Sequence, residues 1–354
     1  MDIFREMAKH GHEQVIFNYD KATGLKAIIA VHDTTLGPAI AGCRMWQYET
    51  DEAALEDALR LSESMTYKAA AAGLDYGGGK TVIIGDPASQ KTEGLFRALG
   101  RFVQTLNGRV TLTEDVGTNA EDFVYLSKET PYVVGLPKAY GGSGDARDLT
   151  ALGVITAMRA ALAHRYGSPE LRERRIAVQG LGKVGLRVVR QAVAEGATVM
   201  VADVNPHAVG NAVAEWDVEP MDPWSILETE CDILSPCALG NVVNQETLPR
   251  LRCAIIAGSA SNQLADSSYA VQLRQRKILY APDFIANSGG LIQVADELKG
   301  YRIDRAHHQI EAIYDTLAAI FKTADEEDSS TLEVAMRIVE ERLALLNQIR
   351  RIYR

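Results

Sequence analysis

Residues 175–205 read "RIAVQGLGKVGLRVVRQAVAEGATVMVADVN", and this stretch decides the fold of the second half of the chain. A short apolar run leads into Gly180, Gly182 and Gly185, which have the spacing G-x-G-x-x-G. A helical segment follows, and then a second apolar run that ends at Asp203. Glycines at this spacing allow a tight turn from strand to helix and leave the first N–H groups of the helix free to bind an anion. The stretch therefore predicts a β–α–β unit that binds a dinucleotide.

Asp203 indicates which dinucleotide is bound. It lies 23 residues after Gly180, where an acidic side chain accepts hydrogen bonds from the adenosine ribose hydroxyls. A carboxylate there repels a 2′-phosphate, and the following residues "DVNPHA" contain no Arg or Lys. We therefore expect NAD rather than NADP. A turn that needs its glycines only for backbone geometry is the alternative, but the strand before it and the strand after it favour the dinucleotide.

The alternation of strand-like and helix-like segments along the chain predicts an α/β fold with two domains. From Arg175 onward, short apolar runs such as "CDILSPCA" and "CAIIAGSA" alternate with helical or turn-rich segments, which is typical of a doubly wound parallel sheet. The first 145 residues also alternate strands and helices, and "YGGSGDARD" (140–148) is the loosest stretch between the two regions. We place the domains at 1–148, completed by a C-terminal helix over 331–354, and at 149–330.

Composition excludes several classes of function. The net charge of −10 argues against a nucleic-acid-binding protein, which would show a basic face. The sequence has neither the apolar core of a signal peptide nor an apolar run of about 18 residues, so we expect no membrane segment and a cytoplasmic location. The cysteines show no CxxC spacing and the histidines no HExxH pattern, so no metal site is expected.

A second motif, "AGLDYGGGKTVIIGDP" (72–87), places Lys80 after three glycines and before an apolar run. It is not a phosphate-binding loop, because the position where that motif needs its first glycine holds Leu74 and a strand follows instead of a helix. A reactive amine fits better, since Lys68 ends the preceding helix and the glycines at 77–79 let backbone and ligand approach both amines. Two ammonium groups and partial desolvation disfavour the charged form, so one lysine can act as a base while the other binds an anion. Asp115, in "LTEDVGT", adds a carboxylate at a strand end.

With these motifs, the chain resembles the amino acid dehydrogenases of the glutamate/leucine/phenylalanine/valine type, and most of all their leucine-specific members. The resemblance covers nearly all 354 residues and extends through further segments: "HEQVIF", "HDTTLGPAIAGCRMW", "EDALRLSESMTYKAAAAGLDYGGGKTVIIGDP", "TEDVGT", "AVQGLGKVG", "IAGSASNQL" and "YAPDFIANSGGLIQVADE". It implies NAD-dependent, reversible oxidative deamination of an L-amino acid to a 2-oxo acid and ammonia. It also implies a cleft between an N-terminal substrate-binding domain, through which a homo-oligomer, commonly an octamer, assembles, and a Rossmann-type NAD-binding domain.

The same resemblance implies a role for each matching residue. Lys80 would be the general base that activates water, Lys68 would bind the substrate carboxylate, and Asp115 would handle the amine and shuttle protons. Asn262 would position the substrate or the nicotinamide amide, and Thr150 would touch the nicotinamide side. The remaining cofactor contacts would come from Gly180, Gly182, Lys183, Val184, Gly185, Asp203, Val204, Cys237, Ala238 and Ala260.

The implied side-chain pocket is aliphatic. Its residues would be Ile40, Ala41, Gly42, Thr113, Leu291 and Val294. No lysine is among them to hold a second carboxylate, so a branched aliphatic substrate is expected. Thr113 stands where leucine dehydrogenases usually carry alanine, and Leu291 where they carry valine. Methyl-scale changes discriminate by only about 1–3 kcal/mol, so phenylalanine and tryptophan substrates stay open. An inactive NAD-binding regulator is a further alternative, but it would be expected to lack one of Lys68, Lys80 and Asp115.

Overall fold

The structure, a computed structural model, describes residues 2–352, and the chain divides into two compact units. Unit 1 comprises Met1–Asp145, Gln293–Arg302 and Val339–Arg354, and unit 2 comprises Ala146–Ile292 and Ile303–Ile338. The expected boundary at residue 148 lies close to the observed one. The prediction places residues 293–302 in the second domain, whereas they belong to unit 1. It places residues 331–338 in the first domain, whereas they belong to unit 2.

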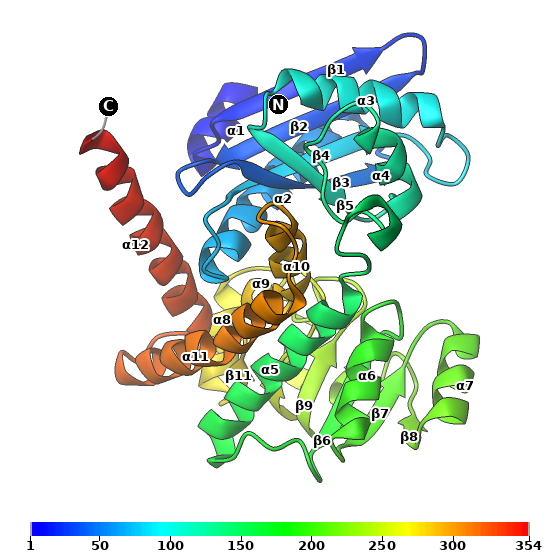
Figure 1. The fold of residues 1–354 in the computed structure, drawn as a ribbon. Helices are drawn as coiled ribbons and strands as arrows, with labels where there is room; N and C mark the ends of the chain where they lie inside the picture. Colours follow the sequence, from blue (N-terminus) through cyan, green and yellow to red (C-terminus); the bar gives the residue numbers. More distant parts are fainter. Residues whose placement is uncertain (1, 353–354) are drawn as a thin grey trace. The chain divides into compact units, whose positions relative to one another are not determined.

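Unit 1 is built on a five-stranded sheet in the order β1-β2-β4-β3-β5 (Figure 1). Strands β3, β4 and β5 are mutually parallel where they pair, whereas β2 runs antiparallel to both β1 and β4. The elements are α1 (Ile3–His10), β1 (Gln14–Asp20), β2 (Leu25–Asp33), β3 (Ala39–Trp46), α2 (Asp51–Ala71), β4 (Gly77–Ile84), α3 (Glu93–Thr105), β5 (Val110–Glu114) and α4 (Ala120–Ser127). The sheet is thus mixed, with β1 at one edge.

Helix α2 covers one face of this sheet. It begins after Thr50, whose side chain accepts a hydrogen bond from the Ala53 N–H, and its first turn holds two acidic residues where the helix dipole favours them. Its apolar face packs on alternate residues of β2 and β4, which are Ile28, Ala30 and Val82. The α2 residues in this cluster are Ala54, Leu55, Ala58 and Leu59. Because side chains alternate along a strand, the neighbouring residues face the opposite core, which includes Phe96 and Phe123.

Unit 2 contains a six-stranded sheet in the order β11-β10-β9-β6-β7-β8, and its strand pairs are all parallel. This is the doubly wound order of dinucleotide-binding folds, so the predicted α/β class with a parallel second sheet is confirmed. Its elements are α5 (Arg147–Tyr166), β6 (Arg175–Gln179), α6 (Gly185–Ala194), β7 (Thr198–Ala202), α7 (Pro206–Glu215), β8 (Val218–Pro220), β9 (Cys231–Pro236), β10 (Cys253–Ile256), α8 (Ser268–Gln275), β11 (Leu279–Tyr280), α9 (Asp283–Ala286) and α11 (Ile303–Glu326).

The chain passes between the units inside two helices, α10 (Gly289–Glu297) and α12 (Thr331–Ile352). Within unit 1, Glu297 of α10 accepts hydrogen bonds from the backbone N–H groups of Gly135 and Ser143, at 2.9 and 2.7 Å. The carboxylate therefore holds the loop that ends the first segment of unit 1. Across residues 2–352, no helix has the length and apolar character needed to cross a membrane.

A buried histidine cluster lies between α2 and the strands of unit 1. His12 is 8% exposed, and its Nε2 lies 3.0 Å from both the Leu59 carbonyl and the Ser62 hydroxyl. The His32 ring packs edge-on against it, with ring centroids 4.8 Å apart. Desolvation is the main cause that lowers the pKa of His12 from 6.5 to about 4. The hydrogen bond to Leu59 raises this pKa and offsets part of the shift, whereas the neighbouring histidines lower it further. His12 is therefore held neutral in the fold.

Stability should fall with acid in a window set by His12. The unfolded chain binds a proton there below about pH 6.5, whereas the folded chain does so only near pH 4, so unfolding becomes easier across this range. The full loss is on the order of 3 kcal/mol. We expect His12→Gln to reduce the change in urea midpoint between pH 7 and pH 4.5. The exposed His207 provides the control as His207→Gln, and an equal pH dependence in all three proteins would refute the assignment.

Candidate active site

The strand register of unit 1 brings Lys80 to the centre of one sheet face. Gly42 of β3 pairs with Lys80 of β4 on one side and with Thr113 of β5 on the other. Because side chains alternate, Asp115 lies on the same face as Thr113, just past the end of β5. Gly42, Lys80 and Asp115, which are predicted from three separate motifs, therefore meet on adjacent strands.

Lys80 and Asp115 form a direct ion pair. The Lys80 ammonium contacts Asp115 Oδ2, and the Lys80 side chain is only 5% exposed, against 25% for Asp115. Desolvation opposes ionisation of the carboxyl, but the charges of Lys80 and Arg44 outweigh it and lower the pKa of Asp115 to about 2. Asp115 is therefore a carboxylate at neutral pH, and it can accept a proton or a hydrogen bond but has none to give.

Gly42 provides the space for this pair. A Cβ atom placed on Gly42 would lie 3.0 Å from Lys80 Nζ and 3.5 Å from Asp115 Cβ. Real Cβ contacts are rarely that short, so a side chain at this position would push the ammonium away from the carboxylate. The absence of a side chain at position 42 thus lets the lysine reach across β3.

Of the two roles expected for the glycines before Lys80, Gly77 and Gly78 have the close approach of backbone. Gly77 and Gly78 belong to strand β4 and do not form an open loop. A Cβ atom on Gly77 would overlap the Asp33 carbonyl, and one on Gly78 would overlap Thr66 of α2. These glycines therefore admit the protein's own backbone and helix α2, and not a ligand. The tight packing seats α2, and with it Lys68, against β4.

Lys68 is half-buried in the last turn of α2, two residues beyond Thr66. The helix ends three residues later, at Ala71. Its ammonium is thus carried by the same helix that packs over Gly78. The structure brings Lys68 to the same sheet face as Lys80, with the helix as its support.

Arg44 is a charged neighbour of this pair, and it is not among the site residues predicted from the sequence. Its Nε donates to Asp115 Oδ2 at 3.3 Å, and its Nη1 donates to Asp57 Oδ2 of α2 at 2.8 Å. The sequence does contain a signal, because an arginine in the otherwise apolar strand "AIAGCRMW" needs a buried partner. The partner itself depends on the parallel pairing of β3 with β5, which the sequence does not reveal.

The residues expected to line the side-chain pocket fall on both units. Ile40, Thr113 and Val294 are buried in unit 1, and Leu291 lies one helical turn before Val294 on the part of α10 that belongs to unit 2. Ala41 points to the opposite face of the sheet, where it belongs to the core cluster, so it can offer only its backbone to a substrate.

Gly135 adjoins two of these pocket residues. A Cβ atom there would lie 3.3 Å from Thr113 Oγ1 and 3.7 Å from Val294 Cγ1. Its N–H is the group held by Glu297, so the loop is fixed close to both side chains. The contact shows that Thr113 and Val294 converge within unit 1.

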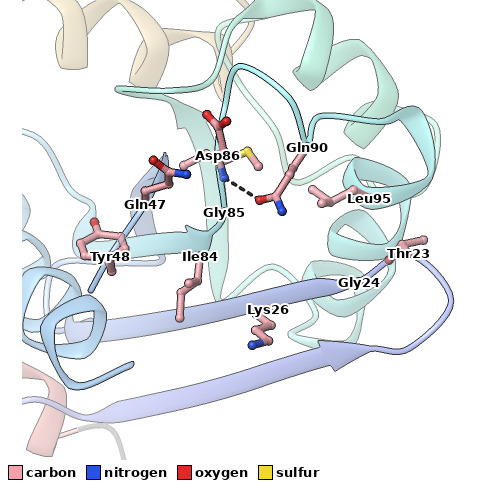
Figure 2. A pocket seen from close by; sticks show the side chains of 11 residues that line it. Thr23, Gly24, Lys26, Gln47, Tyr48, Ile84, Gly85, Asp86, Gln90 and Leu95 are labelled. Carbon is pink, nitrogen blue, oxygen red and sulfur yellow. Dashed lines mark hydrogen bonds between the residues drawn. The ribbon is translucent and has the colours of Figure 1, made fainter. Parts of the chain in front are cut away.

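Another pocket in unit 1, of about 440 Å³, lies away from the Lys80–Asp115 pair (Figure 2). Its lining includes Lys26, Gln47 and Gly85, and neither Lys80 nor Asp115. The Asp86 N–H donates to Gln90 Oε1 at 2.6 Å across it, so two of its polar groups are already paired with each other. We therefore take the ion pair, and not this pocket, as the candidate catalytic centre.

In unit 2, the glycine turn has the geometry that its spacing predicts. Gly180 follows β6 with φ +97°, and a Cβ atom on it would lie 2.7 Å from the Ala238 backbone N. A Cβ atom on Gly185 would overlap the Gly180 carbonyl, whereas one on Gly182 would meet nothing within 4 Å. The first and third glycines are thus required by the turn, and the second leaves open space beside it, as a pyrophosphate needs.

Asp203 follows β7 and is tied to the glycine turn. Its Oδ2 accepts from the Leu181 N–H at 2.6 Å, and its Oδ1 accepts from the Asn205 N–H at 2.8 Å. The carboxylate is therefore fixed beside the turn, half-buried, with further lone pairs for donors. Of the other expected contacts near the turn, Lys183 and Val204 are exposed and Val184 is half-buried at the start of α6.

The remaining expected cofactor residues follow the next strands of the parallel sheet. Cys237 and Ala238 come directly after β9, and Ala260 and Asn262 lie in the loop after β10. Strand β9 is the neighbour of β6 at which the strand order reverses, and ligands of such sheets bind at that point. Thr150 lies in the first turn of α5, where its hydroxyl donates to the Ala146 carbonyl.

The loop that carries Asn262 is rigidly held. Asn262 has φ +54°, a conformation that is uncommon outside glycine, and its carbonyl accepts from the Asn241 N–H at 2.7 Å. The Gln263 side chain, fully buried, donates to the carbonyls of Gly258 and Ala260, both at 3.0 Å. Asn287 is a further polar residue here: its Nδ2 donates to the Ser259 carbonyl at 3.2 Å, and its buried Oδ1 has no partner among the described atoms. That orphaned acceptor suits an amide N–H of a bound ligand.

Two sequence-family profiles match most of the chain. Residues 12–132 match the dimerisation domain of Glu/Leu/Phe/Val dehydrogenase, and residues 141–205 and 204–344 match glutamate/leucine/phenylalanine/valine dehydrogenase. Leucine dehydrogenase of Bacillus cereus is 48% identical over 353 residues, covering 100% of this chain and 96% of the relative.

Relatives named for other substrates are also similar to this chain. Phenylalanine dehydrogenase of Thermoactinomyces intermedius is 49% identical over 353 residues, covering 99% of this chain and 96% of the relative. The crystal structure of L-tryptophan dehydrogenase from Nostoc punctiforme superposes with a TM-score of 0.83 at 41% identity, covering 98% of this chain and 99% of that one. The chain therefore belongs to the glutamate/leucine/phenylalanine/valine family of amino acid dehydrogenases.

Proposed function

We propose that this amino acid dehydrogenase catalyses NAD-dependent, reversible oxidative deamination of a branched-chain aliphatic L-amino acid, such as leucine, valine or isoleucine. The observation that carries the proposal is the buried Lys80–Asp115 pair, set in unit 1 on a sheet face with aliphatic neighbours. A buried amine beside a carboxylate can exchange protons with a substrate, and the aliphatic side chains favour an apolar substrate group.

Each polar residue of unit 1 has a separate task in this proposal. The Lys68 ammonium binds the substrate carboxylate, and the Asp115 carboxylate binds the substrate amine. Lys80, once its amine is neutral, takes a proton from the water that attacks the imine of the substrate. Asp115 stays ionised at neutral pH, so it relays protons between Lys80 and the substrate amine without holding one at rest.

The residues of unit 2 fit a nicotinamide dinucleotide. Bound NAD would supply hydride chemistry at the substrate α-carbon. The N–H groups after Gly182 would hold the pyrophosphate, and Asp203 would accept hydrogen bonds from the adenosine ribose. Cys237, Ala238, Ala260 and Thr150 would line the groove, with Asn262 positioning the substrate or the nicotinamide amide. NAD is proposed over NADP because the Asp203 carboxylate would repel a 2′-phosphate.

The leucine-type preference rests on the pocket residues. Ile40, Thr113, Leu291 and Val294 are uncharged, and the absence of a lysine among them disfavours a substrate with a second carboxylate. The second candidate is the same reaction on an aromatic amino acid. It is favoured by the near-equal similarity to the phenylalanine dehydrogenase and by Thr113, which departs from the usual alanine. Differences of a methyl group change discrimination by about 1–3 kcal/mol, which is 10- to 200-fold in specificity.

Initial rates of reductive amination with NADH, ammonia and a panel of 2-oxo acids test the proposal. We expect the highest kcat/KM with 4-methyl-2-oxopentanoate or another branched aliphatic acid. A preference for phenylpyruvate or indolepyruvate would instead support the aromatic candidate. No turnover with any acid would leave an inactive NAD-binding regulator, although Lys68, Lys80 and Asp115 are all retained.

We also propose that the chain forms a homo-oligomer, possibly an octamer, through unit 1. Strand β1 is one edge of the sheet, and within residues 2–352 it pairs with β2 alone. It exposes Phe17 by 57% and Tyr19 by 64%, and an open edge with exposed aromatic side chains is typical of an association surface. Light scattering should give a multiple of 38.6 kDa, and a mass of one chain would contradict the proposal. The cytoplasmic location stays a prediction from the sequence.

A further inference from the structure

We propose that Arg44 is a positioning residue that competes with the Lys80 ammonium for Asp115 Oδ2 and so weakens the hold of Asp115 on that ammonium. The inference rests on the proposed function, in which Lys80 acts as the base. It concerns a residue outside the set expected to bind substrate and cofactor, and this residue acts through Asp115.

The geometry places two cations on one oxygen. Arg44 Nε donates to Asp115 Oδ2 at 3.3 Å, and the Lys80 ammonium contacts the same Oδ2. A carboxylate shared in this way stabilises each cation less than it would stabilise one alone, and the two cations also repel each other. Arg44 therefore opposes the protonated form of Lys80 from a fixed position.

Arg44 is held in that position from its other side. Its Nη1 donates to Asp57 Oδ2 at 2.8 Å, the Tyr48 hydroxyl donates to the same oxygen at 2.6 Å, and Arg60 Nη2 donates to Oδ1 at 2.9 Å. Asp57 belongs to α2, so the guanidinium bridges the helix to the end of β5. An arginine suits this place because its fork can bond to two carboxylates at once.

The charges of this network are stable around neutral pH. Desolvation disfavours ionised Asp57, but the Tyr48 hydrogen bond and the charge of Arg44 lower its pKa overall. For Arg44, desolvation is outweighed by Asp115 and Asp57, which raise its pKa. Burial, with Asp57, raises the pKa of Tyr48, which stays neutral. Arg44 thus carries its full positive charge at every pH at which the enzyme would work.

Other titratable groups near the pair are accounted for. Helix α2 contributes Lys68 in its last turn, and the far side of the sheet contributes Cys43, whose pKa is raised by burial. The Lys91–Asp122 ion pair lies beyond Cys43 and is neutral as a unit. Arg44 and Lys80 both contact Asp115 Oδ2, which makes Arg44 the group whose effect on the pair is tested.

The direct test follows the protonation of Lys80 without requiring catalysis. The intact enzyme is treated briefly with acetic anhydride between pH 6 and pH 11, and acetylation of Lys80 is quantified by peptide mass spectrometry. In Arg44→Gln, Asp115 no longer shares its charge with Arg44, and the repulsion between Arg44 and Lys80 is gone. Both changes favour the Lys80 ammonium, so the labelling midpoint should rise by about one pH unit. In Arg44→Lys, which keeps the charge but not the fork, it should rise by less than half as much.

Arg97 gives a matched control. It bridges two carboxylates in the same unit, with Nε to Glu93 at 2.8 Å and Nη1 to Glu129 at 3.0 Å. It belongs to α3, whose apolar side packs in the core on the other face of the sheet. Arg97→Gln should leave the Lys80 midpoint unchanged. Circular dichroism checks that each variant is folded, and Arg44→Met, which keeps the aliphatic stem, replaces Arg44→Gln if the latter does not fold.

The pH dependence of kcat/KM for oxidative deamination of the amino acid, in which Lys80 acts as the base, gives the second readout. Its acidic limb should move upward with the labelling midpoint in Arg44→Gln, a shift that a merely structural role would not produce. An unchanged midpoint in Arg44→Gln, or an equal shift in Arg44→Lys or Arg97→Gln, would overturn the inference. If the wild-type enzyme turns over no 2-oxo acid while the labelling midpoint still shifts, the electrostatic role of Arg44 stands and the proposed reaction fails.

Discussion

Lys80→Ala is expected to lower kcat for reductive amination by about 10³-fold, within the range of 10²- to 10⁴-fold that a positioned acid–base group supplies. The variant removes the ammonium that contacts Asp115, so no group in its place can give a proton to the water that leaves as the imine forms. The KM for the 2-oxo acid should change much less, because Lys68 binds the carboxylate in the proposed mechanism. Steady-state kinetics with saturating NADH separates the two parameters.

Lys91 offers a matched control for this substitution. It forms an ion pair with Asp122 at 2.5 Å in the same unit, and its side chain is 22% exposed. Lys91→Ala therefore removes a paired lysine without touching Asp115 and should keep kcat within about twofold of the wild type. Near-normal turnover in Lys80→Ala would show that another group is the base.

Asp203→Ala should raise the KM for NADH by about 10²-fold and reduce the preference for NADH over NADPH. Hydrogen bonds to a charged group contribute about 1.5–3 kcal/mol, so losing the ribose contacts accounts for a change of that size. Removing the carboxylate also removes its repulsion of a 2′-phosphate. The measurement compares kcat/KM for NADH and NADPH at a fixed concentration of the 2-oxo acid.

Asp222 controls for the local effect of losing an aspartate at a turn. Its Oδ1 accepts from the backbone N–H groups of Trp224 and Ser225, at 2.9 and 3.1 Å, much as Asp203 accepts from two backbone N–H groups. Asp222→Ala should leave both cofactor parameters unchanged. An unaltered KM for NADH in Asp203→Ala would remove Asp203 from the cofactor site.

The nucleotide-binding turn could be predicted because its physical requirements are local. Gly180 needs a positive φ and Gly185 has no room for a side chain beside the Gly180 carbonyl, so both must be glycine at that spacing. The parallel sheet followed from the apolar runs in the same way. These features depend on residues within one β–α–β unit, and the sequence displays them side by side.

The site in unit 1 could be predicted only in part, because its contacts join distant segments. Lys80 and Asp115 were expected from their motifs, but their direct contact depends on β3 lying between β4 and β5, with Gly42 leaving the gap. The packing of Thr66 onto Gly78 and the bridge made by Arg44 depend on α2 crossing the same sheet face. No local pattern carries that information, so the sequence indicates neither the packing of Thr66 onto Gly78 nor the bridge made by Arg44.

The assembly of unit 1 from both ends of the chain has a consequence for the timing of synthesis. Arg342 of α12 donates hydrogen bonds to the Ala70 carbonyl, 272 residues earlier, and to Asp75. Glu340 accepts from the Tyr67 hydroxyl at 3.1 Å, so the end of α2 that carries Lys68 is covered by residues made after the whole nucleotide-binding sheet. At about 5–20 residues per second, a ribosome needs on the order of 15–50 seconds to supply them. Lys68 is thus among the first site residues to be translated and among the last to receive its supporting contacts.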